Sequence, residues 1–248
     1  MIAAILKEST LGENRVAATP KTVKELIKSG LTVRIQSEAG KASFYTDQDY
    51  IDAGAEVISD ILSLYNNVNI VLKVAPATIA EIESFPNGTA YVSLMQTTRQ
   101  NQQVQKLTEK NITGFSMHLI PRTTLAQSMD ALSSQANIAG YKSVLVGATH
   151  LPVYMPLLMT AAGTIPPARV LILGAGVAGL QAIATSKRLG AQVEAFDVRP
   201  EVKEQVESLG AKFVEIASDS DDGVGEGGYA KETSDDYKQR QQALIKEQ

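Results

Sequence analysis

A glycine-rich segment directly follows an apolar run in the second half of the chain. Gly174, Gly176 and Gly179 are spaced as G-x-G-x-x-G, between a strand predicted over Arg169–Leu173 and a helix predicted over Leu180–Arg188. In such a turn the first glycine permits the tight bend, the second lets the backbone approach a pyrophosphate, and the third lets helix and strand pack closely. The helix N-terminus adds N–H donors and a positive dipole. We expect the cofactor-binding residues of this turn to be Gly174, Gly176, Val177, Ala178 and Gly179.

An acidic residue follows the next predicted strand, Gln192–Phe196. Asp197 lies 23 positions after Gly174, where a carboxylate can accept hydrogen bonds from both hydroxyls of an adenosine ribose. The same carboxylate would repel a 2′-phosphate, so the pattern favours NAD(H) over NADP(H), although Arg199 could hold such a phosphate. A ligand-free glycine turn, an FAD site and an S-adenosylmethionine site share parts of this pattern. Asp197, Val198 and Arg199 are the candidate cofactor-binding residues at this strand end.

Strand-like and helix-like patterns alternate along the chain, which predicts mainly parallel sheets covered by helices. The expected fold class is α/β, with two α/β domains, residues 1–138 and 139–248, joined by a helix over Ser128–Gly147. The second is predicted to be a Rossmann dinucleotide-binding domain. In the first domain we expect strands at Ile2–Leu6, Leu31–Gln36, Asn69–Val74, Thr89–Leu94 and Asn111–Met117. The helices expected there are Pro20–Ser29, Asp47–Ala53, Val57–Leu64, Thr78–Ser84 and Gln100–Lys110.

Composition excludes several kinds of site. The chain has no cysteine, and its two histidines, His118 and His150, are 32 positions apart, so we expect no metal site. The net charge of −4 is carried by Ser218–Gln248, and the remaining residues balance to zero. A neutral folded part argues against nucleic acid as a partner. The N-terminus lacks the features of a secretory signal, which predicts a cytoplasmic protein.

The uncharged stretch Ser143–Gly163 is 21 residues long, about the length of a membrane span. Pro152 and Pro156 divide it into short pieces. We therefore interpret it as buried helices and expect no membrane span in this chain.

The second domain is predicted to be incomplete. An open dinucleotide-binding sheet has about six strands, but only two or three are predicted after Pro166. Ser218–Gly228 is acidic and glycine-rich, which is typical of a mobile surface loop. We expect this Rossmann domain to be truncated.

Four segments of the sequence point to one family. They are residues 13–20 (ENRVAATP), 127–141 (QSMDALSSQANIAGY), 159–164 (MTAAGT) and 227–232 (GGYAKE). Together they resemble the NAD(H)-binding component, the alpha subunit, of proton-translocating nicotinamide nucleotide transhydrogenase. The resemblance covers the whole chain.

The resemblance implies which residues orient the nicotinamide ring. Arg122, Gln127 and Asp130 match an Arg-Gln-Asp set that reaches the ring from the first domain, with Ser133 beside it. An arginine can pair with pyrophosphate, and a glutamine offers a donor and an acceptor to the carboxamide. From the residues alone, Asp130 would be interpreted as a helix cap and Arg122 as a surface arginine.

The resemblance also implies a reaction and an assembly. Gly228 and Tyr229 match a mobile loop that closes over the nucleotide. Hydride would pass directly between NAD(H) on this chain and NADP(H) on a partner domain, without a protein acid or base. The implied assembly is a homodimer attached peripherally to the inner membrane, on its cytoplasmic side, through an NADP(H)-binding partner and a membrane partner that translocates protons.

Alanine dehydrogenase shares this architecture and is the alternative enzyme. It binds an oxo acid with an arginine and a lysine, which Arg15 and Lys73 match, and uses a histidine as acid and base, where this chain has Ser93. Serine cannot shuttle a proton at neutral pH, so this activity is disfavoured. Arg15 and Lys73 are then predicted to be structural, paired with Glu8 or Glu13. A nucleotide-binding fragment without activity is the remaining alternative.

Overall fold

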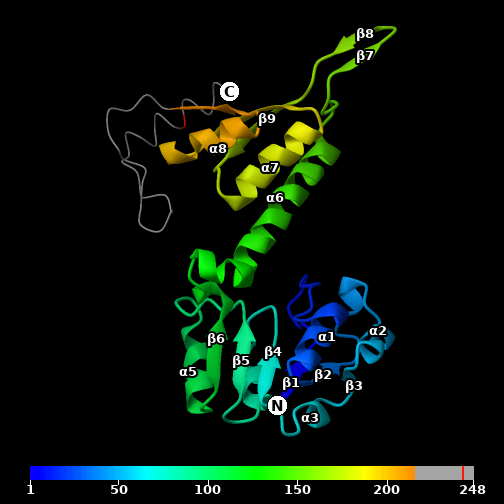
Figure 1. Cartoon of the computed structure of the whole chain (residues 1–248), viewed down its shortest axis with the longest axis vertical. Coiled ribbons are helices and arrows are strands. Elements are labelled where there is room, and N and C mark those ends of the chain that lie inside the picture. Colours follow the sequence, from blue (N-terminus) through cyan, green and yellow to red (C-terminus); the bar gives the residue numbers. More distant parts are fainter. Residues whose placement is uncertain (216–241, 243–248) are drawn as a thin grey trace. The chain divides into compact units, whose positions relative to one another are not determined.

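The computed structural model describes residues 1–215 and Gln242 (Figure 1). The chain forms two compact units, Met1–Pro121 and Arg122–Gln248. Each unit contains helices and a parallel sheet, so the predicted α/β class is confirmed.

The first unit is built on a six-stranded parallel sheet with the order β3-β2-β1-β4-β5-β6. Ile5 on β1 is in register with Ile35 on β2 and Leu72 on β4. The strands are β1 (Ile2–Ile5), β2 (Thr32–Gln36), β3 (Glu56–Ile58), β4 (Ile70–Leu72), β5 (Ala90–Ser93) and β6 (Thr113–Ser116). The helices are α1 (Pro20–Lys28), α2 (Asp47–Asp52), α3 (Ile61–Leu64), α4 (Ile79–Ser84) and α5 (Asn101–Glu109), with 3₁₀ helices at Lys41–Ser43 and Met117–Leu119.

Signals visible in the sequence set the ends of α1. The Thr22 N–H donates to the Thr19 side chain, Pro20 occupies the first turn, and Gly30 follows the helix with φ +87°. The central strands read as short apolar runs because their side chains are buried, as for Ile5 and Val71, both 0% exposed.

One predicted helix of the first unit is wrong. Residues 57–64 contain two elements, the strand β3 and the single-turn helix α3. Val57 and Ile58 extend the sheet beside β2, and the Asp60 carboxylate then accepts the Ser63 N–H at 2.7 Å to begin α3. The apolar residues of two short successive elements together resemble the sequence pattern of one helix.

The second unit contains a three-stranded parallel sheet with the order β11-β10-β9. The helix α6 begins at Ala131, later than the predicted Ser128, because Asp130 caps it, and a 3₁₀ helix, Thr124–Met129, precedes it. Its regular elements are α6 (Ala131–His150), β7 (Leu158–Thr160), β8 (Gly163–Ile165), β9 (Arg169–Leu173), α7 (Val177–Arg188), β10 (Gln192–Phe196), the 3₁₀ helix Pro200–Val202, α8 (Lys203–Ser208) and β11 (Lys212–Phe213).

The stretch 143–163 is not a set of buried helices. It contains the end of α6 and then β7, which pairs antiparallel with β8 as a hairpin. Pro152 and Pro156 lie in the connection, where the helix cannot continue. Met159 on the hairpin is 80% exposed. Among the described residues no helix is both long and apolar enough to cross a membrane.

Candidate functional site

The turn between β9 and α7 has the backbone that its glycines predicted. Gly174 adopts φ +94°, and a Cβ on Gly179 would lie 1.7 Å from the Gly174 carbonyl oxygen. A Cβ on Gly176 would meet no atom within 4 Å, and Gly176 is the N-cap of α7. The turn thus has one glycine for its bend, one for close packing, and one with open space at a helix N-terminus.

The helix α6 lies beside this turn, against the start of α7. It packs along α7 (Figure 1), and the Asn137 side-chain amide donates to the Gln181 side-chain oxygen at 2.9 Å. The cavity beside the two helices has a volume of about 820 Å³. Of the predicted site residues, it is lined by Arg122, Ser133, Gly174, Gly176, Val177, Ala178 and Gly179.

Asp130 and Ser133 form the cap of α6. The Ser133 N–H donates to Asp130 Oδ1 at 2.9 Å, and its hydroxyl donates to Oδ2 at 2.5 Å. The hydrogen bonds from Ser133, followed by the positive charge of Arg122, lower the pKa of Asp130. Gln127 is exposed on the preceding 3₁₀ helix. Neither Asp130 nor Gln127 lines the cavity, although both lie in the segment between Arg122 and Ser133, which do.

Asp197 lies at the end of β10 and is fixed by two neighbours. Its Oδ2 accepts the Ala175 N–H of the glycine turn at 2.6 Å, and its Oδ1 accepts the Arg199 N–H at 2.9 Å. The Arg199 guanidinium contacts both oxygens, each at 3.0 Å. Burial raises the pKa of Asp197, but the hydrogen bonds from Arg199 and Ala175 outweigh it and lower the pKa overall. Val198 is half-buried and packs against the small cluster of Phe196 and Val214.

The predicted loop residues Gly228 and Tyr229 lie outside the described residues. Within the described part of the chain, no group of three His, Cys, Asp or Glu side chains is placed to hold a metal ion.

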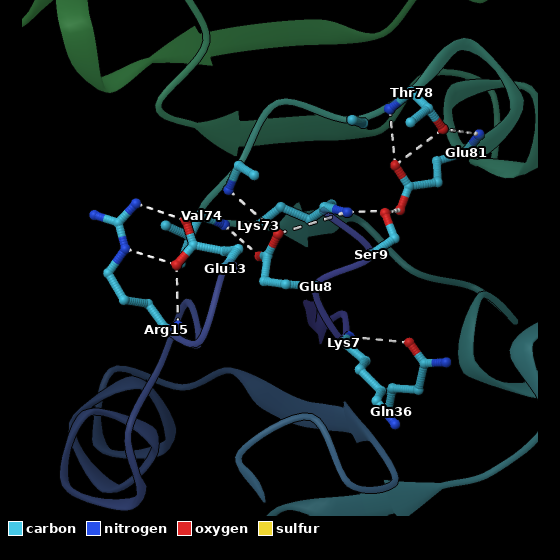
Figure 2. Close-up of polar contacts among 12 residues, drawn as sticks. Lys7, Glu8, Ser9, Glu13, Arg15, Gln36, Lys73, Val74, Thr78 and Glu81 are labelled. Carbon is cyan, nitrogen blue, oxygen red and sulfur yellow. Dashed lines mark hydrogen bonds and ion pairs between the residues drawn. The ribbon is translucent and has the colours of Figure 1, made fainter. Parts of the chain in front are cut away.

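A second polar cluster lies in the first unit, around the buried ammonium of Lys73 (Figure 2). Lys73 Nζ donates to Glu81 at 2.6 Å and lies 3.7 Å from Glu8. The side chains of Lys73 and Glu8 are only 0% and 3% exposed. Glu8 also accepts the Val74 N–H at 2.6 Å, and Ser9 donates to Glu81 at 2.9 Å. The cluster therefore joins the segment after β1 to the end of β4 and to α4.

Arg15 lies close to this cluster but belongs to another pair. Its guanidinium donates to both oxygens of Glu13, at 2.8 and 2.6 Å. The expected pairing of Arg15 and Lys73 with Glu13 and Glu8 is thus confirmed. Ser93, where the acid–base histidine would stand, is 1% exposed at the end of β5.

Glu81 is a member of the cluster that the sequence pattern did not predict. A signal for it exists, because Thr78 and Glu81 form the T-x-x-E capping box of α4, in which the Thr78 N–H donates to Glu81 at 2.7 Å. That signal predicts the helix start but not the contact with Lys73, which depends on the neighbouring strand.

The parallel sheets, the glycine turn at a helix N-terminus and the acid at the end of the next strand define a Rossmann-type α/β protein. The chain belongs to the alanine dehydrogenase/PNT family: the family's N-terminal domain matches residues 4–139 and its C-terminal domain matches residues 143–248.

The relatives of this chain include transhydrogenase subunits and alanine dehydrogenases. The first segment of the NAD(P) transhydrogenase alpha subunit of Rickettsia prowazekii is 42% identical, over 97% of this chain and 63% of that protein. The Rhodospirillum rubrum protein of the same name is 43% identical, over 98% and 65%. The Staphylococcus haemolyticus alanine dehydrogenase is 30% identical, over 83% and 55%. This chain therefore spans less than two thirds of the length of each relative.

Two solved structures that superpose on this chain are likewise a transhydrogenase and an alanine dehydrogenase. A transhydrogenase from Sinorhizobium meliloti superposes with a TM-score of 0.84 at 44% identity, over 87% of this chain and 64% of that chain. An L-alanine dehydrogenase superposes with a TM-score of 0.75 at 27% identity, over 86% and 60%.

Proposed function

We propose that the chain is the NAD(H)-binding component of a proton-translocating transhydrogenase. The observation that carries this is the cavity of the second unit, where Arg122 and Ser133 line the same space as the glycine turn. Higher identity to transhydrogenase subunits than to an alanine dehydrogenase supports the choice within the family. We assign the first functional domain to residues 1–138 and the second to residues 139–248, a division supported by the two family matches.

In this proposal the protein binds and orients, and the nicotinamide supplies the hydride chemistry. The N–H groups at the start of α7, beside Gly176, hold the pyrophosphate, and Asp197 accepts hydrogen bonds from the adenosine ribose. Arg122, Gln127 and Asp130 orient the nicotinamide toward NADP(H) on the partner domain. Because the hydride passes directly between the two rings, the chain needs no acid or base. Gly228 and Tyr229 complete the nucleotide contacts.

The proposed assembly is a homodimer with an NADP(H)-binding partner and a membrane partner that translocates protons. The names of the two transhydrogenase relatives, each of which denotes one portion of an alpha subunit, support further subunits. Large apolar side chains exposed on α6 and on the β7–β8 hairpin support a protein interface. They include Ile138, Tyr141, Val146 and Met159. The component would attach through its partners to the cytoplasmic side of the inner membrane.

The contacts of Arg15 and Lys73 disfavour alanine dehydrogenase activity. Lys73 is fully buried and hydrogen-bonded to Glu81, and the guanidinium of Arg15 is paired with Glu13. Binding an oxo acid would require breaking these pairs. Ser93 could not replace a histidine in proton transfer.

Separate titrations with NADH and NADPH, followed by fluorescence of the reduced nicotinamide, test the proposal. Tighter binding of NADH, and nicotinamide-to-nicotinamide hydride transfer once an NADP(H)-binding domain is added, are the expected results. Tighter binding of NADPH would overturn the cofactor assignment. Reduction of NAD by alanine without a partner would favour the dehydrogenase, and NADH binding without transfer would favour an inactive nucleotide-binding protein.

A further inference from the structure

The acceptor positions of the Asp197 carboxylate are all filled by donors from described residues. Oδ1 accepts the N–H and the Nε of Arg199, and Oδ2 accepts the Ala175 N–H and the Nη2 of Arg199, at 2.6 to 3.0 Å. A carboxylate offers about four lone-pair positions. Asp197 is only 5% exposed at its side chain, so its hydrogen bonds depend on these groups rather than on bulk water.

The four donors differ in how easily they can move away from the Asp197 carboxylate. The Ala175 N–H belongs to the glycine turn, and the Arg199 N–H belongs to the main chain two residues beyond Asp197. Moving either would reshape the backbone. The guanidinium of Arg199 can leave by rotation of its own side chain, which is 16% exposed and therefore reaches solvent. A ribose hydroxyl can donate a hydrogen bond to Asp197 only at an acceptor position that the guanidinium has left.

We infer that the Arg199 guanidinium takes the place of the adenosine ribose when no nucleotide is bound. It holds two of the four Asp197 acceptor positions and must turn away when the nucleotide binds. This inference rests on the proposed function, because the displacing ligand is NAD(H). In the absence of nucleotide, the guanidinium keeps a buried carboxylate paired and oriented. On binding, neutral hydroxyls replace a charged donor, so the Asp197–Arg199 pair lowers the apparent affinity for the nucleotide.

The test is the affinity for NADH of Arg199→Ala, measured by nicotinamide fluorescence. Removing the competitor should tighten NADH binding roughly fivefold, which corresponds to about 1 kcal/mol, because the ribose hydroxyls no longer compete with a charged donor for the carboxylate. The same variant should unfold at a lower temperature without nucleotide, because Asp197 loses its charged partner. Arg188→Ala is the matched control, since it removes an exposed arginine of the same unit and should change neither quantity.

A second variant shows whether the effect passes through Asp197. In an Asp197→Asn background, which binds NADH more weakly, Arg199→Ala should give no further gain, because the contested carboxylate is gone. Unchanged or weaker NADH binding by Arg199→Ala alone would overturn the inference, as would an equal gain in both backgrounds. Failure of the wild-type chain to bind NADH would instead refute the proposed function, and this inference with it.

Discussion

Gly140 on α6 lies directly against Ala178 in the first turn of α7: a Cβ on Gly140 would come within 2.1 Å of the Ala178 carbonyl oxygen. This approach lets α6 reach the glycine turn, and Gly140 itself lines the cavity with Arg122 and Ser133. The relationship joins the two sides of the proposed nucleotide site. It depends on a glycine that belongs to no phosphate-binding motif.

Gly140→Ala should therefore damage both stability and binding. The added methyl group would separate α6 from α7 and cost roughly 2–4 kcal/mol, as overpacking of a tight contact does. Gly147→Ala on the same helix is the control, because its Cβ would meet no atom within 4 Å. It should be neutral or stabilising by about 1 kcal/mol, through higher helix propensity. Thermal unfolding and NADH titration of both variants measure the difference, and equal stabilities would contradict the packing argument.

Substitutions of two glycines in the turn should distinguish an effect on folding from an effect on nucleotide binding. Gly179→Ala would place a methyl group 1.7 Å from the Gly174 carbonyl oxygen and should destabilise the second unit by roughly 3 kcal/mol or more. Gly176→Ala has open space and ordinary backbone angles, so it should fold with a stability within about 0.5 kcal/mol of wild type.

The same Gly176→Ala protein should nevertheless bind NADH about tenfold more weakly or worse, because its methyl group occupies the space into which the pyrophosphate must come. Circular dichroism establishes that each variant is folded, and fluorescence titration gives the affinity. Normal NADH binding by Gly176→Ala would argue against pyrophosphate at this turn.

Local patterns in the sequence account for most of the fold, because they report contacts between near neighbours. Periodicity and caps predicted β1, α1, α2 and the whole β9–α7–β10 unit within a few residues. They failed at residues 57–64, where two short elements imitate one helix. They also failed at the β7–β8 hairpin, where apolar residues are exposed rather than buried.

The site shows the same limit. The glycine spacing and Asp197 could be recognised in the sequence, but the partner of the Arg199 guanidinium could not. Its spacing suited a phosphate contact, whereas the structure directs its guanidinium to Asp197. Likewise, the contact between Lys73 and Glu81 exists only because β4 and α4 meet in three dimensions. The Lys73–Glu81 contact is decided by tertiary packing, which no local pattern encodes, whereas Arg199 and Asp197 are only two residues apart and their spacing was compatible with more than one partner.

Gln127→Ala should show whether Gln127 orients the nicotinamide ring without contributing to folding. Gln127 is exposed on its 3₁₀ helix, so its removal should leave the unfolding temperature unchanged. Under the proposed function it should slow hydride transfer to a partner-bound NADP analogue about tenfold, since misplacing a reacting ring costs rate more than affinity. Gln102→Ala, an exposed glutamine on α5, is the control. Unaltered transfer by Gln127→Ala would remove this residue from the proposed site.

Lys73→Met should destabilise the first unit in a pH-dependent way. Without the buried ammonium, Glu8 and Glu81 remain close with no cation between them, and the loss near neutral pH should be about 3 kcal/mol. Burial already raises the pKa of Glu8, despite opposing hydrogen bonds from Val74 and the charge of Lys73. Removing Lys73 should raise it further.

A carboxyl group whose pKa is raised by folding takes up its proton in the folded state first. The stability of Lys73→Met should therefore recover as the pH falls from neutral through the raised pKa of Glu8. Lys106→Met, which breaks two pairs with exposed carboxylates, should cost less than about 1 kcal/mol at any pH. Urea unfolding, followed by near-ultraviolet circular dichroism of Tyr65 and Tyr91 beside Phe85, reports on this unit. A loss of stability independent of pH would show that Glu8 does not carry the uncompensated charge.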